Sequence, residues 1–407
     1  MKSIQDEFNE IEASKSWHQV FLKIRQQTQK NDYSLAIARN PRNKRLNRYR
    51  DVSPYDHSRV KLEKGDSDYI NASLVEVPEA NRKYILAQGP LDHTVDHFWQ
   101  MVWEQKSKAI IMLTNLIERG TIKCSSYYPR EDEEDHVLLS DDPFLKVTCL
   151  SVQRHSYYRV NTFELEEVSS GKKREVLHFH YASWSDFSVP QSPEAFLKFL
   201  HQVRLSGSLD STVGPPVIHC SAGIGRSGTF CLVDSSLVLI KKRGGPNGLQ
   251  LQQLLLEMRK CRMGLIQTPE QLRFSYIAVL EGANTILERG SLGDILIENN
   301  EPEEAPPLPP RVKRPNSSTE STPTEETKPL VEDEAGETKN SEQELRKRKR
   351  DEKKEELAKK VSDMKKKMKT SESWNETRST LNKIGMGVGV GVVAAIALIA
   401  IVNYFSH

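Results

Sequence analysis

Short apolar runs alternate with helical patterns over the first 295 residues of the chain. The runs at 109–114 (AIIMLT) and 215–220 (PPVIHC) are short and almost continuously apolar, which predicts buried strands. The segment 228–242 (GTFCLVDSSLVLIKK) has a helical pattern that stops at Gly-Gly-Pro. Strands and helices mixed in this way predict an α/β domain over residues 1–295, with a largely buried sheet and helices on its faces.

The composition changes near residue 296. From there to 383 the chain is rich in Pro, Glu, Ser, Thr and Lys and has very few apolar residues. Such a segment cannot bury enough surface to offset about 1–2 kcal/mol of backbone entropy per residue, so we expect a disordered tail. Within it, residues 306–311 (PPLPPR) fit a PxxPxR ligand of SH3-type domains, or else form a stiff linker. The charged run at 346–369 is either a nuclear-import or membrane-surface patch or a solvated spacer.

Residues 384–402 (IGMGVGVGVVAAIALIAIV) contain no charge. As a helix this stretch would be about 28 Å long, close to the hydrocarbon thickness of a bilayer. Lysines and arginines precede it, which places the N-terminal part of the chain on the cytoplasmic side. The pattern predicts a transmembrane tail anchor, with the lipid bilayer as its partner.

The bulk composition narrows the class of protein only slightly. A net charge of +2 argues neither for nor against nucleic acid, and no nucleic-acid partner is expected. The five cysteines are odd in number and widely spaced, without a C-x-x-C, and the N-terminus lacks the apolar core of a signal peptide. We therefore expect free thiols in a reducing compartment, with no disulfide framework, no metal site and no cofactor.

The stretch 215–230 (PPVIHCSAGIGRSGTF) carries the candidate chemistry. Only a thiolate attacks an electrophile, and an unperturbed thiol, with a pKa of about 8.5, is mostly protonated at neutral pH. Inward-pointing amides of the loop and the start of the following helix would stabilise a thiolate at Cys220. Gly223 and Gly225 permit the curl, Arg226 offers a planar donor pair for an oxyanion, and Ser227 offers a hydroxyl. The residues thus predict a nucleophile in a phosphate cradle.

Two plainer interpretations compete with this one. An isolated cysteine at a strand end is usually structural, and a glycine-rich turn before a helix is often only a turn or a nucleotide-binding loop. The nucleotide-binding loop is excluded because the G-x-x-x-x-G-K-[ST] pattern requires a lysine that this loop lacks.

The loop also resembles the signature of the cysteine-dependent protein tyrosine phosphatases. Six other motifs resemble that family and follow its order: NRYRDVSPYDHSRV (47–60), DYINAS (68–73), YILAQGP (84–90), FWQMVW (98–103), WSDFSVP (184–190) and QTPEQLRFSY (267–276). They cover roughly residues 40–285. With the predicted anchor, the resemblance is to the non-receptor subfamily, which has an endoplasmic-reticulum-bound member. It implies a single tyrosine-phosphatase domain, with a twisted mixed sheet flanked by helices, before the tail and one transmembrane helix.

The resemblance implies a role for each catalytic residue. Cys220 attacks phosphorus and forms a phosphocysteine, while Arg226 and the loop amides hold the phosphoryl oxygens. Asp186 is the general acid and then the base, Gln267 positions the hydrolytic water, and Ser227 helps the thiolate leave. The remaining residues assigned to this loop and its support are Ser221, Ala222, Gly223, Ile224, Gly225, Gln271, Glu118 (which would orient Arg226) and His219.

The resemblance also implies how the substrate is held. Tyr49 and Phe187 match the aromatic walls around the phenol ring, Val52 matches a further apolar wall, and Asp51 matches the residue that binds the peptide backbone. Lys123 sits where the family keeps a lysine that meets the acid loop. Two arginines match a second basic pocket for tandem phosphotyrosines: Arg25 and Arg259.

The acid loop departs from the family pattern. Ser185 replaces a proline and Ser188 replaces a glycine of the usual W-P-D-F-G-V-P. Losing the proline costs about 0.4–1 kcal/mol, which would slow turnover about two- to fivefold if it fell wholly on loop closure. Because Asp186 is present, we expect a weakened enzyme and not an inactive one.

The expected function is hydrolysis of phosphotyrosine on cytoplasmic signalling proteins, including tyrosine kinases and their substrates, and hence negative regulation of tyrosine-kinase signalling. The expected location is the endoplasmic reticulum membrane, with the catalytic domain facing the cytoplasm. Three alternatives stay open: a membrane-tethered phosphotyrosine-binding scaffold with weakened catalysis, a phosphatase acting on lipids or phosphoserine, and an unanchored nuclear form.

Overall fold

The computed structural model describes residues 3–30, 32–129, 137–138, 144–184 and 188–289, all within one compact unit. The predicted tail, the PxxPxR motif and the apolar stretch 384–402 lie outside these residues, and so do Asp186 and Phe187. No helix in the described part of the chain is both long enough and apolar enough to span a bilayer.

A mixed sheet forms the centre of the domain. In the described residues its nine strands run in the order β1-β2-β3-β11-β4-β10-β9-β8-β7. Strand β11 is parallel to both β3 and β4, β4 is parallel to β10, and the other pairs are antiparallel. The strands are β1 (Arg59–Lys61), β2 (Tyr69–Val77), β3 (Arg82–Ala87), β4 (Ala109–Met112), β7 (Val137–Leu138), β8 (Leu145–Arg154), β9 (Tyr158–Glu167), β10 (Lys172–Tyr181) and β11 (Val217–His219).

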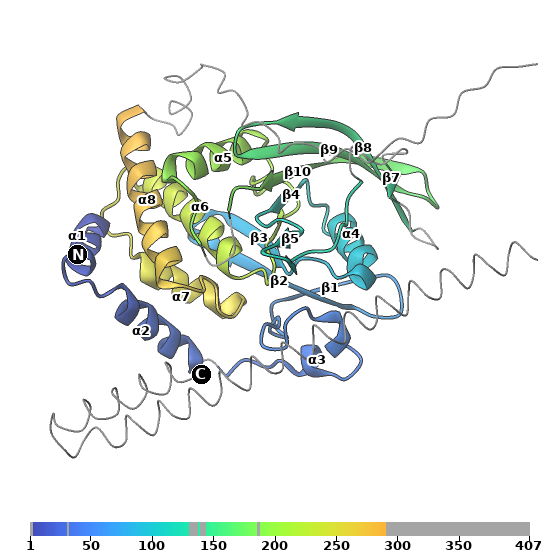
Figure 1. Cartoon of the computed structure of the whole chain (residues 1–407), viewed down its shortest axis with the longest axis horizontal. Coiled ribbons are helices and arrows are strands. Elements are labelled where there is room, and N and C mark those ends of the chain that lie inside the picture. The colour runs from blue at the N-terminus through green and yellow to red at the C-terminus, as the bar shows by residue number, and fades with distance from the viewer. Residues whose placement is uncertain (1–2, 31, 130–136, 139–143, 185–187, 290–407) are drawn as a thin grey trace, which may run out of the picture. The chain divides into compact units, whose positions relative to one another are not determined.

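Helices flank the sheet, and two further short strands pair with each other without joining it (Figure 1). These two strands are β5 (Ile117–Glu118) and β6 (Thr121–Ile122). The helices are α1 (Ile4–Ala13), α2 (Trp17–Gln29), α3 (Ala36–Arg39), α4 (Val95–Glu104), α5 (Pro193–Leu205), α6 (Gly225–Arg243), α7 (Leu251–Cys261) and α8 (Pro269–Arg289), with short 3-10 turns η1 (Lys44–Leu46), η2 (Pro78–Ala80) and η3 (Asp92–Thr94).

The central strands are buried on both faces. Successive side chains of a strand point to opposite faces, and in β11 Ile218 packs into one apolar cluster while Val217 packs into the other. Apolar residues of α5, α6 and α8 share the cluster of Ile218, and those of α4 share the cluster of Val217. The continuously apolar runs of β4 and β11 follow from this two-sided burial, and the predicted mixed sheet flanked by helices is confirmed.

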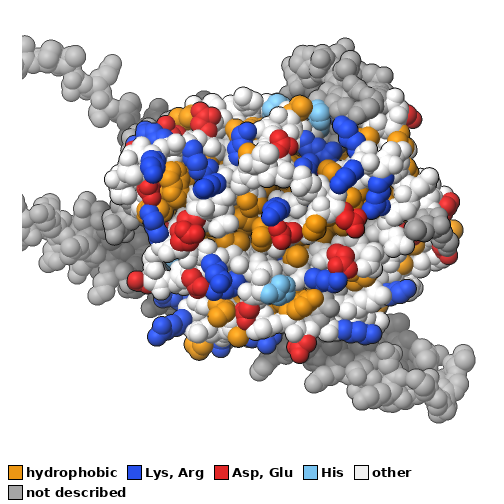
Figure 2. Space-filling model, turned by 180° about the vertical axis from the view of Figure 1, so that it is seen from behind, with side chains coloured by type: hydrophobic (Ala, Val, Ile, Leu, Met, Phe, Trp, Pro, Cys, Tyr) orange, Lys and Arg blue, Asp and Glu red, His pale blue; other side chains and the backbone are white. Residues whose placement is uncertain are grey.

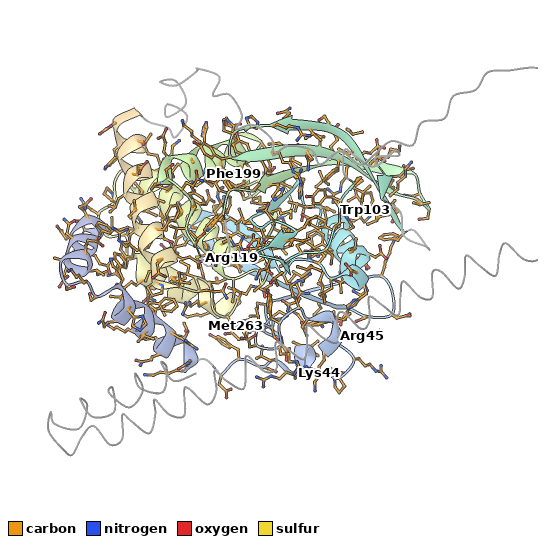
Figure 3. All side chains as sticks on the ribbon, viewed as in Figure 1. Lys44, Arg45, Trp103, Arg119, Phe199 and Met263 are labelled. Atoms are coloured by element: carbon orange, nitrogen blue, oxygen red, sulfur yellow. The ribbon has the colours of Figure 1, made fainter. Side chains whose placement is uncertain are left out.

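Aromatic side chains join α5 to the long strands. Phe199, labelled in Figure 3, has its ring centroid 5.3 Å from that of Tyr158 and 5.0 Å from that of Tyr181. On the outside, basic and acidic side chains are interspersed over the face seen in Figure 2. The domain is therefore held from within by apolar contacts, and its visible face has no single dominant charge.

Helix α6 follows β11 after a loop of five residues and runs from the middle of the sheet. Its C-terminal cap is Gly244, which has the left-handed φ of 72° that ends many helices. Its N-terminus has no side-chain cap, and the amide of Ser227 in its first turn acts on the thiol of Cys220. This strand-loop-helix unit places the candidate nucleophile at the carboxyl end of the central strands.

Candidate active site

Cys220 is the first residue after β11, and its side chain is 3% exposed. The loop curls back on it, so that the amide of Gly223 donates a hydrogen bond to its Sγ at 3.3 Å. Gly223 has a φ of +71°, and a Cβ there would lie 2.1 Å from the carbonyl oxygen of Ala87. Only glycine fits this position, for reasons of both conformation and space.

The surroundings favour the thiolate of Cys220. Burial alone raises the pKa of a thiol, but the charge of Arg226, then the nearby hydroxyl and amide of Ser227 and the amide of Gly223 outweigh it. The net pKa of Cys220 is lower than that of an ordinary thiol. The arginine, the loop amide of Gly223 and the first turn of α6 thus all act on the thiol in the direction of the thiolate.

Arg226 is held by a buried carboxylate. Its Nη1 and Nη2 donate to the two oxygens of Glu118, at 2.7 Å and 2.9 Å, and both side chains are less than 10% exposed. Burial raises the pKa of Glu118, but hydrogen bonds and charge from Arg226, with smaller contributions from Asn115 and Thr114, bring it below its usual range. The carboxylate fixes the plane of the guanidinium, as the resemblance implied.

Trp184 anchors one flank of the expected acid loop. Its carbonyl accepts a hydrogen bond from Nη1 of Arg226 at 2.8 Å, and its indole nitrogen donates to the carbonyl of Ser188 at 2.9 Å. The indole is fully buried and meets the ring of Phe196 at 5.8 Å. The residues on either side of 185–187 are thus tied to each other and to the arginine.

A cleft of about 240 Å³ opens above the loop. Its wall includes Tyr49, whose hydroxyl lies 2.7 Å from Oγ of Ser221. That Oγ donates to the carbonyl of Lys123 at 2.8 Å, so the tyrosine hydroxyl donates in turn to Ser221. The cleft is lined by Tyr49, Asp51, Val52, Lys123, Cys220, Ser221, Ala222, Arg226, Gln267 and Gln271. Ten residues named from the sequence are brought together here.

The two glutamines approach from the start of α8. The amide of Gln267 donates to Oε1 of Gln271 at 2.9 Å, and a Cβ on Gly225 would lie 2.5 Å from Oε1 of Gln267. A side chain at Gly225 would therefore displace the end of the Gln267 side chain from its place beside the loop. The preceding Ile266 has a φ of +64°, which is strained for a β-branched residue, and its amide donates to the carbonyl of Ile224 at 2.9 Å.

The two arginines of the expected second pocket differ in their surroundings. Arg25 is exposed on α2. Arg259 is 2% exposed, and its guanidinium donates to the carbonyls of Leu265 at 2.8 Å and Ile266 at 3.0 Å. In the structure Arg259 holds the strained turn that presents Gln267, while binding of a second phosphate stays a prediction.

His219 and Ser227 lie beneath the loop, and both side chains are fully buried. The His219 ring contacts the carbonyl of Cys220 at 3.1 Å and the hydroxyl of Tyr127 at 2.7 Å. All five cysteines of the chain are free thiols. Across the residues that the structure describes, there is no group of three or more His, Cys, Asp or Glu side chains arranged to hold a metal ion.

Sequence reasoning missed Arg262. This fully buried side chain donates to the carbonyls of Gly223 at 2.9 Å and Ala222 at 3.0 Å, and to Oδ1 of Asn71 at 2.9 Å. By binding the Ala222 carbonyl, it fixes the peptide group whose amide, that of Gly223, donates to Sγ of Cys220. Three basic residues follow one another closely at 259–262, and the sequence contains no signal that singles out this one.

Comparison with known proteins identifies the family of this chain. A family model described as protein-tyrosine phosphatase matches residues 43–281. Tyrosine-protein phosphatase non-receptor type 2 of Homo sapiens is 53% identical over 284 residues, which are 70% of this chain and 66% of that protein. Tyrosine-protein phosphatase non-receptor type 61F of Drosophila melanogaster is 47% identical over 308 residues, or 73% of this chain and 56% of that protein.

The first relatives are thus matched over slightly less than two thirds of their own length. Their names carry the non-receptor designation that the resemblance implied. The seven motifs and the family match cover nearly the same residues, and the family expected from the motifs is confirmed. This chain belongs to the protein-tyrosine phosphatase family.

Proposed function

We propose that the chain is a protein-tyrosine phosphatase that hydrolyses phosphotyrosyl proteins through a phosphocysteine intermediate. The observation that carries this proposal is the arrangement of Cys220 and Arg226. A thiol with a lowered pKa lies in the loop between β11 and α6, near an arginine that Glu118 holds in place. The relatives' names, tyrosine-protein phosphatase, point to the same chemistry.

In the first step, the Cys220 thiolate attacks phosphorus and the bond between phosphorus and the tyrosyl oxygen breaks. Asp186 gives its proton to the departing oxygen, which leaves as the tyrosine hydroxyl. Arg226 and the loop amides hold the equatorial oxygens, whose charge must be stabilised throughout the transfer. The phosphoryl group is then bonded to sulfur.

In the second step, water attacks phosphorus and the bond between sulfur and phosphorus breaks. Gln267 positions the water and Asp186 takes its proton, while Ser227 helps the sulfur leave as a thiolate. The products are inorganic phosphate and the starting enzyme, so no cofactor is consumed.

The preference for tyrosine follows from the depth of the cleft. Tyr49 stands at its wall and is fixed to the loop through Ser221, so a phosphorylated side chain must reach past the ring to meet Cys220. We therefore expect a phosphoserine side chain to be too short for this reach and a lipid head group to be too bulky for this wall.

The proposed substrates are cytoplasmic signalling proteins, including tyrosine kinases and their targets, whose signalling the enzyme would oppose. We further propose that residues 384–402 anchor the chain in the endoplasmic reticulum membrane and that residues 306–311 bind SH3-type domains. Imaging the full chain beside a chain truncated before residue 384 tests the anchor. A truncated form found in the nucleus would support the unanchored form, and an unchanged reticular pattern would contradict the anchor.

Turnover of a phosphotyrosyl peptide, beside its phosphoseryl twin, tests the activity. The full-length protein should release phosphate only from the tyrosyl peptide, Cys220→Ser should be silent, and Asp186→Ala should be about 10²- to 10⁴-fold slower. Loss of the alkaline limb of the pH–rate profile in Asp186→Ala would identify it as the acid. If the unaltered protein binds the peptide but is as silent as Cys220→Ser, the scaffold function is correct instead.

The serines of the acid loop predict a weakened enzyme. Ser185→Pro should raise turnover about two- to fivefold, because proline reduces the freedom that the loop loses on closing. A serine-to-proline substitution outside the acid loop serves as the control. Both variants keep Ser188. Unchanged or slower turnover of Ser185→Pro would rule out this explanation.

A further inference from the structure

A chain of four hydrogen bonds connects Asn161 to the backbone carbonyl of Cys220, the candidate nucleophile. Asn161 Nδ2 lies 3.0 Å from His178 Nδ1, and His178 Nε2 lies 2.7 Å from the hydroxyl of Tyr127. That hydroxyl is 2.7 Å from His219 Nε2, and His219 Nδ1 is 3.1 Å from the carbonyl oxygen of Cys220. The four side chains are at most 3% exposed, so water does not interrupt the chain.

The two ends of the chain determine which atom donates in each bond. The Cys220 carbonyl can only accept, so His219 carries its hydrogen on Nδ1 and leaves Nε2 bare to accept from Tyr127. The Tyr127 oxygen then accepts from Nε2–H of His178, which leaves the Nδ1 of His178 bare. The amide nitrogen of Asn161 can only donate, and it meets that bare Nδ1. Every donor therefore points the same way, from Asn161 toward Cys220.

This arrangement requires both imidazoles to be neutral. Burial lowers the pKa of His219 to about 4 and that of His178 well below its ordinary value. Burial also raises the pKa of Tyr127, so its hydroxyl keeps its proton. The two histidines are thus held in opposite tautomers over the whole neutral range.

We propose that Asn161 is a positioning residue for Cys220, because through His178, Tyr127 and His219 it keeps an N–H directed at the carbonyl of the nucleophile. The proposal rests on the proposed function only in taking Cys220 as the nucleophile. Asn161 faces His178 directly across strands β9 and β10, so the contact is built into the register of the sheet.

The direction of the chain matters for the thiolate. Each donor presents the positive end of its dipole toward Cys220, and hydrogen-bonded chains polarise one another. Without the Asn161 amide, His178 can carry its hydrogen on Nδ1 and accept from Tyr127. His219 must then donate from Nε2, and its bare Nδ1 faces the Cys220 carbonyl. The reversed chain thus replaces an attraction beside the nucleophile with a repulsion between lone pairs.

Other charged, titratable or hydrogen-bonding groups also influence Cys220, His219, His178 and Tyr127, and their effects must be distinguished from that of the hydrogen-bonded chain. They are Arg226, Ser227, Gly223, Arg262 and Cys124 around Cys220, Arg48 beside His219, His180 and Arg159 beside His178, and Cys124, Tyr128 and Arg159 beside Tyr127. Burial lowers the pKa of His180 to about 3 and raises that of Cys124 to about 12, so neither changes charge near pH 6.

Nitrogen NMR of the full chain, labelled with ¹⁵N in histidine, reads the tautomers directly. The unaltered protein should show His219 protonated at Nδ1 and His178 protonated at Nε2. In Asn161→Leu both rings should become mixtures of tautomers, whereas Thr162→Val, on the other face of β9, should leave them unchanged. Finding His219 protonated at Nε2 in the unaltered protein would overturn the proposal even if the variants did not fold.

The rate at which iodoacetate alkylates Cys220 measures the consequence, because only the thiolate reacts. At about pH 6, Asn161→Leu should react about two- to fivefold more slowly than the unaltered protein, and Tyr127→Phe about three- to tenfold more slowly. At about pH 10, where the thiolate dominates in all of them, the rates should converge. Equal rates at pH 6 would refute the positioning role.

Alkylation needs no phosphatase turnover, so the two proposals fail separately. If the tautomers and rates follow the prediction while phosphotyrosyl peptide is not hydrolysed, only the proposed function is wrong. If peptide is hydrolysed and Asn161→Leu alters neither tautomers nor alkylation, only the role of Asn161 is wrong.

Discussion

Helix α6 and the loop before it contain the same kinds of residue twice, once at the cleft and once within the core. A buried cysteine, a buried ion pair and a glycine with positive φ occur at the start, as Cys220, the Arg226–Glu118 pair and Gly223. Another set occurs farther along the helix, with Cys231, Asp234 and Gly244. The two sets have similar residue types but different neighbours. The neighbours decide whether a thiol is ionised and whether an ion pair lines the cleft or stabilises the core.

The two thiols show the difference most clearly. Burial raises the pKa of both, and at Cys231 the charge of Asp234 raises it further, so this thiol stays protonated. At Cys220 the charge of Arg226 and the loop donors outweigh burial and lower the pKa. Burial alone therefore does not make a cysteine inert, because the charges and amides around it decide its protonation.

The two ion pairs differ in whether a charged side chain lines the cleft. Asp234 is fully buried and accepts from Arg82 at 2.9 Å, Arg204 at 2.7 Å and Tyr84 at 2.6 Å, which ties α6 to β3 and α5. Arg226 meets one carboxylate and still lines the cleft. The Asp234 cluster stabilises the packing of the helix, whereas Glu118 orients a cation at the wall of the cleft.

Exchange of the two thiols for serine should give the largest contrast. Cys220→Ser should lower turnover of phosphotyrosyl peptide at least about 10⁴-fold, because it removes the nucleophile. Cys231→Ser should leave turnover within about twofold, because its thiol lies in the core. Comparable losses in the two variants would show that Cys220 has only a structural role.

Neutralising the two carboxylates should separate stability from activity. Asp234→Asn should lower the free energy of unfolding by about 3–5 kcal/mol, because a fully buried carboxylate no longer balances the charges of two partly buried arginines. The turnover of the folded fraction should hardly change. Glu118→Gln should instead lower turnover about 10- to 100-fold through a misplaced Arg226. Urea unfolding and steady-state kinetics on both variants provide the measurements, and equal loss of activity would contradict the distinction.

The two glycines should differ although their φ values are nearly equal. Gly244→Ala should lower the free energy of unfolding by about 1 kcal/mol, since the left-handed conformation is its sole penalty and no atom lies within 4 Å of the added Cβ. Gly223→Ala should cost more than about 2 kcal/mol and also abolish turnover, because the Cβ collides with the Ala87 carbonyl. An active Gly223→Ala variant would mean that the loop tolerates displacement.

The pH dependence of stability should show the smallest contrast. Cys220 has a lowered pKa when folded, so between that value and about 8.5 the unfolded chain binds a proton that the folded protein has released. Stability therefore rises with pH in this window, and Cys220→Ser should remove that rise. Cys231 has a raised pKa, so above about 8.5 the unfolded chain releases its proton first and stability falls. Cys231→Ser should remove that fall, and identical slopes in the two variants would contradict the assignment.

The cysteine loop could be predicted because its residues are consecutive. Strand β11, the turn, the start of α6 and the arginine lie within one stretch, and their spacing alone predicts an anion cradle. Gly223 was assigned correctly on the same basis. For Gly225 the spacing alone does not reveal the nearest neighbour, since a Cβ there would meet the side-chain end of Gln267, about forty residues away.

The parts that could not be predicted join distant segments. Arg262 supports the loop from after α7, Trp184 ties the acid-loop flank to Arg226, and Asn161 reaches Cys220 through three side chains on other segments. Arg259 is the opposite case, a residue for which the sequence predicted a phosphate pocket. In the structure its guanidinium donates to the carbonyls of a turn.

By itself, the sequence determined the α/β class, the family and the candidate nucleophile with its arginine, because backbone conformation and the pairing of consecutive groups depend on neighbours along the chain. Only the tertiary structure decided which buried groups act on Cys220 and in which direction the hydrogen bonds beneath it run. Electrostatic interactions weaken with distance and hydrogen bonds require contact, so both depend on which segments the fold brings within a few ångströms of each other.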